Sequence, residues 1–110
     1  MKWAIDYIPE ARKDIKNLDH SQWLSLRRAI EKVRQNPLPD YEGGYGKPLG
    51  NKGNINLSGC LKIKLKASGL RAVYRLIRTE TTMQMVVIGL RAEEEVYKTA
   101  EKRLQKIRSE

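Results

Sequence analysis

Residues 60–77 read CLKIKLKASGLRAVYRLI, and this stretch decides the fold that we expect. Over residues 61–66 an apolar residue alternates with lysine, which is the period of a strand with one buried and one exposed face. Ser68 and Gly69 then predict a turn, and residues 70–78, in which Val, Ile and Leu are frequent, predict a second strand. The stretch therefore predicts a β-hairpin with a basic face.

A hairpin centred on this turn sets Lys66 opposite Arg71 and Lys62 opposite Arg75, for a loop of either two or four residues. With Lys64 between them, five cations then share one small patch of sheet. Lysines on a solvated strand can serve only to prevent edge-to-edge association. Like charges opposite each other destabilise a sheet, however, and guanidinium groups beside lysines suit phosphate oxygens. We therefore interpret the patch as a candidate phosphate site.

The segments before the hairpin predict one strand and two helices. Residues 2–8 alternate between two faces, which indicates a half-buried strand. Pro9 can open a helix whose apolar positions recur at helical spacing as far as Leu18. Asp19 and Gln22 have the spacing of a capping box at the start of a second amphipathic helix. We expect the two helices to pair as a hairpin.

The remaining segments complete an α+β fold. Residues 36–59 are so rich in Gly, Pro and Asn that we expect a long loop with room for one short strand. Three strand patterns and a final helix pattern follow, over residues 60–66, 70–78, 83–90 and 92–107. We predict a single domain over residues 1–110, with an N-terminal strand and helical hairpin packed on an antiparallel sheet of about four strands, and a C-terminal helix.

The charge of the chain points to a polyanionic partner. Lys and Arg number 22 against 13 Asp and Glu, which gives a formal net charge of +9. Such a surface attracts nucleic acid over a distance. We expect no membrane partner, since no apolar run approaches the ~18 residues of a spanning helix and no signal-peptide pattern opens the chain. The expected location is the cytoplasm.

Metal chemistry is not expected from the residue types. His20 and Cys60 are the single histidine and cysteine, too few for a zinc site, and we interpret both as structural. The acidic residues are scattered along helix patterns and loops, which disfavours a magnesium-dependent nuclease. We therefore expect no metal ion and no other cofactor.

Two residues beyond the hairpin could complete a site. Arg91 follows the last strand, and Tyr97 lies in the second turn of the C-terminal helix. A strand end and a helix turn beside the basic hairpin would form a shallow cleft. Tyr97 taken alone could equally be an ordinary packing contact between helix and sheet.

The chain resembles RelE toxins of the RelE/ParE toxin superfamily, which belong to type II toxin–antitoxin systems. Residues 60–74, CLKIKLKASGLRAVY, resemble the central hairpin of these toxins, and residues 89–97, GLRAEEEVY, resemble their C-terminal signature. With the leading strand and helix pair included, the likeness spans nearly the whole chain. The loop over residues 37–59 departs from it, since it looks longer and richer in glycine than in the best-known member.

The resemblance implies a RelE-like fold and a metal-independent endoribonuclease, an mRNA interferase that cuts codons in the ribosomal A site. It implies the ribosome, mRNA and rRNA as partners, and a RelB-like antitoxin that holds the toxin inactive. The residues that match the family's active positions are Lys62, Lys64, Arg71, Arg91 and Tyr97. We add Lys66 and Arg75 as expected RNA contacts.

RNA can supply its own nucleophile, because a 2′-hydroxyl can attack the neighbouring phosphate. The protein must then accept one proton, stabilise the phosphorane and protonate the leaving oxygen. Crowding among like charges helps a lysine to give up its proton, so we expect Lys64 to act as the base. We expect Arg71 to clamp the nonbridging oxygens, Arg91 to clamp or to donate a proton, and Tyr97 to stack or to donate from its hydroxyl.

Two other functions compete with this hypothesis. A ParE-like toxin that inhibits DNA gyrase would share the scaffold without needing the nuclease residues. A non-catalytic RNA-binding module would use the same basic face without chemistry. Mapping of cleavage ends on ribosome-bound message distinguishes these functions, since only the nuclease produces codon-phased ends.

Overall fold

The computed structural model describes residues 2–52, 54–90 and 92–109, with the backbone alone at residues 51 and 52. Within these ranges five strands form one sheet in the order β1-β5-β4-β3-β2. The strands are β1 (Ala4–Tyr7), β2 (Lys47–Lys52), β3 (Ile55–Leu65), β4 (Leu70–Ile77) and β5 (Thr82–Gly89). The helices are α1 (Pro9–Lys16), α2 (His20–Val33) and α3 (Glu93–Arg108), with short 3-10 turns η1 (Asp40–Glu42) and η2 (Arg78–Glu80).

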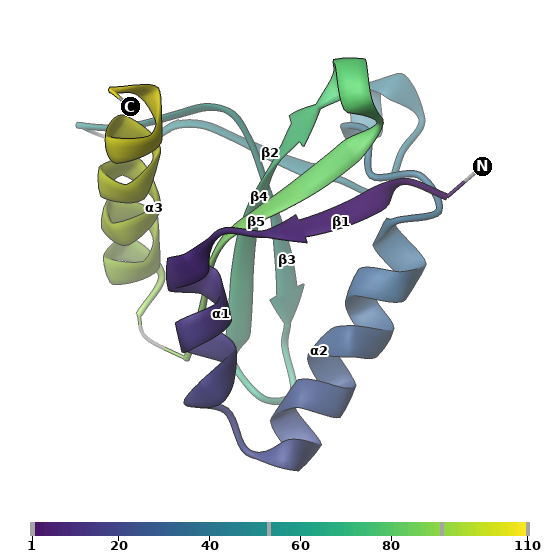
Figure 1. The fold of residues 1–110 in the computed structure, drawn as a ribbon, viewed down its shortest axis with the longest axis vertical. Coiled ribbons are helices and arrows are strands. Elements are labelled where there is room, and N and C mark those ends of the chain that lie inside the picture. The colour runs from purple at the N-terminus through teal and green to yellow at the C-terminus, as the bar shows by residue number, and fades with distance from the viewer. Residues whose placement is uncertain (1, 53, 91, 110) are drawn as a thin grey trace.

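The sheet confirms the predicted α+β class but differs in two details from the expected antiparallel sheet of about four strands. It has a fifth strand, β2, and its edge strand β1 pairs with β5 in parallel. A period-two pattern states which side of a strand is buried and not which direction its neighbour takes. Figure 1 shows β1 beside β5, and the α1–α2 hairpin follows β1 along the chain.

The two N-terminal helices form as their sequence patterns predict. Pro9 is the first residue of α1, where its missing N–H costs no helical hydrogen bond. The capping box at the start of α2 is confirmed: the Gln22 N–H donates to Asp19 Oδ1 at 2.7 Å, and the Asp19 N–H donates to Gln22 Oε1 at 3.0 Å. Leu26 and Ile30 are the buried residues of α2. The apolar stripe therefore sets which side of the helix packs on the sheet.

The glycine-rich region contains more strand than the sequence predicts. It holds β2, and β3 begins at Ile55 where we expected residue 60. The β2–β3 pairing shifts register between Pro48 and Gly50, and both Gly50 and Gly59 have positive φ angles, of 64° and 84°. Glycine usually weakens or ends a regular strand, but here Gly50 and Gly59 lie within strands that remain paired and are only locally irregular.

The buried face of the hairpin lies on the side of α2. Leu61 pairs with Tyr74, and Ile63 pairs with Ala72, and all four are buried. The Tyr74 hydroxyl donates to the Pro37 carbonyl at 2.9 Å, which ties this face to the segment after α2. Burial raises the pKa of Tyr74 well above its ordinary value, so this hydroxyl stays protonated as a donor.

Helix α3 packs on the same sheet but lies apart from α2 in Figure 1. It contacts β3, β4 and β5, and its buried residues Val96, Tyr97, Ala100 and Leu104 join the core. Because Leu61 faces α2, its neighbour Lys62 must face the opposite side, where it meets α3. In the described ranges, no helix combines the length and apolar character that crossing a membrane requires.

Candidate active site

The β3–β4 hairpin carries the predicted basic residues, but its register differs from the predicted one. Lys64, and not Lys66, lies opposite Arg71, while Cys60 lies opposite Arg75. Lys66 instead belongs to the turn. The predicted pairings of Lys66 with Arg71 and of Lys62 with Arg75 are therefore wrong.

The turn explains the change in register. It covers residues 66–69, so its centre lies one residue earlier than we expected. Gly69 has a φ of 76° and its N–H donates to the Leu65 carbonyl at 2.9 Å, which closes the turn. The residue opposite each position differs from the predicted one by two, an even number of residues, so each side chain keeps its predicted face of the sheet.

Three cations gather on the face that α3 borders. Lys62 and Lys64 alternate with buried residues on β3, and Arg71 is the cross-strand neighbour of Lys64. Side chains of directly opposed residues share one face and begin about 5 Å apart. Lys47 on β2 lies opposite Lys62 and extends the same row across a third strand. The sheet thus carries several cations close together across three neighbouring strands.

The first turn of α3 adds a carboxylate to these cations. Glu93 Oε1 lies 3.9 Å from Lys62 Nζ and accepts a 2.7 Å hydrogen bond from the Tyr97 hydroxyl. Glu93 and Tyr97 are one helical turn apart, so they lie on one side of α3. The arrangement is a row of donors and cations with the Glu93 carboxylate at its border.

Hydrogen bonds, burial and neighbouring charges together set the protonation of Glu93 and Tyr97. The Tyr97 hydrogen bond and the positive charges of Lys62, Arg71 and Lys64 lower the pKa of Glu93, which is therefore ionised at neutral pH. Burial, and then the bond to Glu93, raise the pKa of Tyr97. The tyrosine consequently acts as a donor and the glutamate as an acceptor.

Tyr97 is positioned for its hydroxyl and not for its ring. The residue is only 3% exposed, so its ring is packed within the core cluster. A base stacks on an aromatic face only if that face is open. In this conformation, the stacking role that we considered for Tyr97 is not available, whereas the hydroxyl reaches Glu93.

The expected RNA contact Arg75 lies outside this group. Its Nε donates to Gln84 Oε1 at 2.7 Å, and Gln84 Nε2 donates to Asp6 Oδ2 at 2.8 Å, which links β4, β5 and β1. Arg75 also lines a hollow of about 780 Å³ with Tyr41 and Arg78. Arg75 is therefore not part of the group formed by Lys62, Lys64 and Arg71. Arg91 falls outside the described residues.

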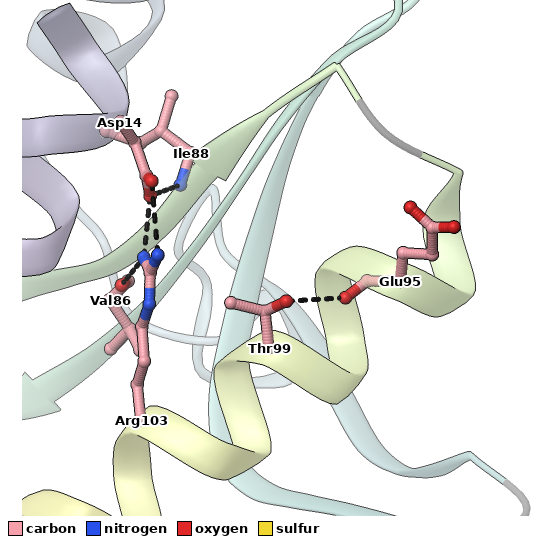
Figure 2. Close-up of polar contacts among 6 residues, drawn as sticks. All are labelled: Asp14, Val86, Ile88, Glu95, Thr99 and Arg103. Carbon is pink, nitrogen blue, oxygen red and sulfur yellow. Dashed lines mark hydrogen bonds and ion pairs between the residues drawn. The ribbon is translucent and has the colours of Figure 1, made fainter. Parts of the chain in front are cut away.

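The rest of α3 is fastened by a second ionic contact, shown in Figure 2. Arg103 donates to both carboxylate oxygens of Asp14 on α1, at 2.6 and 3.1 Å, and to the Val86 carbonyl at 2.9 Å. Asp14 accepts in addition from the Ile88 N–H at 2.9 Å. Asp14 thus joins α1, β5 and α3, which sets where the first turn of α3 meets the hairpin.

Proteins similar in sequence to this chain are known. A RelE-like toxin protein of Escherichia coli is 30% identical over 105 residues, which cover 94% of this chain and 99% of the relative. The chain belongs to the RelE family of toxins. The mRNA interferase toxin RelE of Escherichia coli is 28% identical over 104 residues, with the same coverage of 94% and 99%. No family model matches the chain.

Solved RelE structures share the fold. A double mutant of Escherichia coli RelE in the free state superposes with a TM-score of 0.72 at 25% identity, over 94% of this chain and 99% of that one. The same toxin in complex with an antitoxin RelBc peptide gives a TM-score of 0.67 at 25% identity, over 91% and 95%. The RelE-like fold expected from the hairpin and C-terminal signature is confirmed.

Two residues that the structure places beside the predicted cations were not expected from the sequence. Glu93 is not among the candidate residues predicted from the sequence, although it stands four residues before Tyr97, a spacing that places both on one side of a helix. Lys47 was hidden in the region expected to be a loop. Within the described part of the chain, no three His, Cys, Asp or Glu residues are grouped so as to hold a metal ion.

Proposed function

We propose that this RelE-family chain is the toxin of a toxin–antitoxin system and cuts messenger RNA on the ribosome without a metal ion. Residues 1–110 would act as one toxin domain in the cytoplasm. The observation that carries the proposal is the convergence of Lys62, Lys64 and Arg71 on one face of the sheet, beside the first turn of α3. The mRNA interferase named among its relatives supports the same activity.

The geometry suits cleavage by the RNA's own 2′-hydroxyl. A phosphate on the Lys64–Arg71 pair would be held by an ammonium group and a guanidinium fork. The same cations would stabilise the extra negative charge of the phosphorane. Cleavage would leave a cyclic phosphate on one product and a 5′-hydroxyl on the other. DNA lacks the 2′-hydroxyl and would not be cut.

The remaining predicted residues have supporting roles in this proposal. Lys66 on the turn and Arg75 beside the neighbouring hollow would contact RNA away from the scissile phosphate. Lys47 would extend the phosphate row from Lys62. Arg91 is included because it matches the family's active position.

The ribosome would supply what the site lacks. A substrate must be held with the 2′-oxygen in line with the leaving oxygen, and such orientation provides a large part of the rate. The site is an open sheet face, on which Lys64 is exposed. Message bent by the ribosome into the attack geometry would be cut at codons in the A site. The net charge of +9 favours docking on ribosomal RNA, with a strong dependence on salt.

An antitoxin would be the second partner. Escherichia coli RelE has been solved with an antitoxin RelBc peptide. A RelB-like antitoxin with acidic or amphipathic segments would neutralise the cationic face of this chain. Copurification with the product of the neighbouring small gene tests this partner.

Primer extension on ribosome-bound message tests the nuclease directly. The wild-type chain should produce ends in phase with codons, and only when ribosomes are present. Lys64→Ala and Arg71→Ala should each lower the cleavage rate by about 100-fold, since each removes a charge that stabilises the transition state. The control is Lys102→Ala, which removes an exposed charge from α3 and should leave the rate unchanged.

Three outcomes would contradict the proposal. Cleavage by both variants at the wild-type rate would show that the site lies elsewhere. Binding of RNA without new ends would favour a non-catalytic RNA-binding module. Inhibition of DNA gyrase without cleavage of message would favour a ParE-like toxin.

A further inference from the structure

Glu93 is a carboxylate placed among the cations of a proposed phosphate site. Its Oε1 is 2.7 Å from the Tyr97 hydroxyl oxygen and 3.9 Å from Lys62 Nζ, and its side chain is 48% exposed. A site that only bound phosphate would be weakened by this charge, because two anions repel each other. The carboxylate therefore requires another explanation.

A favourable charge at the start of a helix does not explain Glu93. Glu94 and Glu95 stand in the same first turn and already complement the helix dipole. Glu94 pairs with Lys98 at 3.1 Å on the exposed side of α3. Glu93 is the acidic residue of this turn that contacts the hairpin.

We propose that Glu93 accepts the proton of the attacking 2′-hydroxyl. This inference rests on the proposed function and replaces the expectation that Lys64 is the base. The O–H bond breaks and its proton passes to the Glu93 carboxylate, while the 2′-oxygen forms a bond to phosphorus. The bond from phosphorus to the 5′-oxygen breaks, and that oxygen keeps the electron pair and takes a proton from a lysine ammonium of the same face.

The position of the carboxylate suits this step. Tyr97 and Lys62 both contact Oε1, so Oε2 is the oxygen that would accept the proton. The Tyr97 ring is packed in the core, and its hydroxyl therefore holds the carboxylate in one orientation. A phosphate held by Lys64 and Arg71, beside Lys62, would place its ribose within hydrogen-bonding reach of Glu93 in the first turn of α3. General bases act over such hydrogen-bonding distances.

The groups around Glu93 keep its carboxylate in the ionised form that can accept a proton. The groups that face Glu93 are Tyr97 on α3, Lys62 and Lys64 on β3, and Arg71 on β4. The Tyr97 hydrogen bond and the three positive charges lower the pKa of Glu93, so the carboxylate is ionised at neutral pH. A base with a low pKa is weak, but the cations that lower it also stabilise the phosphorane. The cleavage rate should fall with decreasing pH only below the ordinary range of glutamate.

Single-turnover cleavage of message in the ribosomal A site tests the inference across a range of pH. Glu93→Gln keeps an oxygen that accepts from Tyr97 but cannot take the proton. Its rate at neutral pH should fall by about 100-fold or more, and the acidic limb should vanish. Binding of a message with a 2′-deoxyribose at the cleavage point should remain within about threefold. The matched control is Glu94→Gln, which should cut at the wild-type rate.

The outcomes separate this inference from the proposed function. A wild-type chain that makes no codon-phased cuts would overturn both. A wild-type chain that cuts, together with a Glu93→Gln variant that cuts equally fast or faster, would overturn only the role of Glu93. A slower Glu93→Gln variant that keeps the acidic limb would show that the carboxylate only supports structure, and this too would overturn it. Restoration of part of the rate by Glu93→Asp would support it.

Discussion

Helix α3 is held at its two ends by contacts of different kinds. In the C-terminal half, Arg103 meets Asp14 through two hydrogen bonds of 2.6 and 3.1 Å, and both side chains are less than one-fifth exposed. In the first turn, Glu93 lies 3.9 Å from Lys62, and the exposed fractions are 48% and 29%. Figure 2 shows that the Arg103–Asp14 contact is also hydrogen-bonded to two backbone groups of β5, the Val86 carbonyl and the Ile88 N–H.

The difference separates structure from function along one helix. A pair that is largely buried and bidentate has little freedom to exchange partners, so it determines where α3 lies. An exposed pair at a longer distance is weak in water and can exchange its partner for a substrate. The C-terminal half of α3 is thus an anchor, whereas its first turn can exchange its partner, as the proposed chemistry requires.

Breaking the anchor should have the largest effect on stability. Arg103→Ala leaves the Asp14 carboxylate without its ionic partner in a mostly buried place, and should lower the free energy of unfolding by about 2–3 kcal/mol. Urea denaturation measures the loss. Arg108→Ala, an exposed charge at the end of the same helix, is the control and should change stability by less than about 0.5 kcal/mol.

A double-mutant cycle sharpens this prediction. Combining Arg103→Ala with Asp14→Ala should give a coupling energy above about 1 kcal/mol, because the two side chains share their hydrogen bonds. Coupling near zero would remove the distinction between the two ends of α3.

Removing a single hydroxyl at the other end should affect chemistry more than stability. Tyr97→Phe keeps the packed ring but deletes the hydrogen bond to Glu93, so we expect about tenfold slower cleavage and less than about 1 kcal/mol lost in unfolding. The Tyr97 bond is the leading cause of the lowered pKa of Glu93. Without it that pKa rises, and the acidic limb of the pH–rate profile should move to higher pH. A profile identical to the wild type would argue against the arrangement.

The smallest effect is expected on the exposed side of α3. Lys98 and Glu94 form a pair 3.1 Å long whose side chains are 64% and 72% exposed. Lys98→Ala should change the free energy of unfolding by no more than about 0.5 kcal/mol, and high salt should abolish that change. Cleavage should be unaffected. If Lys98→Ala lowered the free energy of unfolding as much as Arg103→Ala does, the exposure of an ion pair on this helix would not predict how much it contributes to stability.

Much of the site could be predicted because a strand pattern assigns faces. Lys62 and Lys64 had to share a side once the segment was interpreted as a strand, and Arg71 joined them in any register shifted by an even number. The opposed pairs were not predictable, since they depend on whether the turn centres between Ser68 and Gly69 or one residue earlier. That choice follows from local hydrogen bonds such as the one from Gly69 to Leu65.

The glycine-rich region shows the opposite case. Its breakers indicated a loop, because a residue's local preference says nothing about the partner that a neighbouring strand offers. Pairing along β3 compensates for the irregularity at Gly50 and Gly59, and it brings Lys47 beside Lys62. No local pattern could have revealed that neighbour.

The sequence by itself determined the α+β class, the capped helix α2, the basic face of the hairpin and the membership in the RelE family. The first three follow from periodicity, capping and composition, which act over a few residues at a time, whereas the family membership follows from likeness to a relative along nearly the whole chain. Only the tertiary structure brought the carboxylate of Glu93 to Lys62 and the guanidinium of Arg103 to Asp14. Such contacts join residues far apart in the chain, and they exist only where packing of α3 against the sheet holds both partners in place.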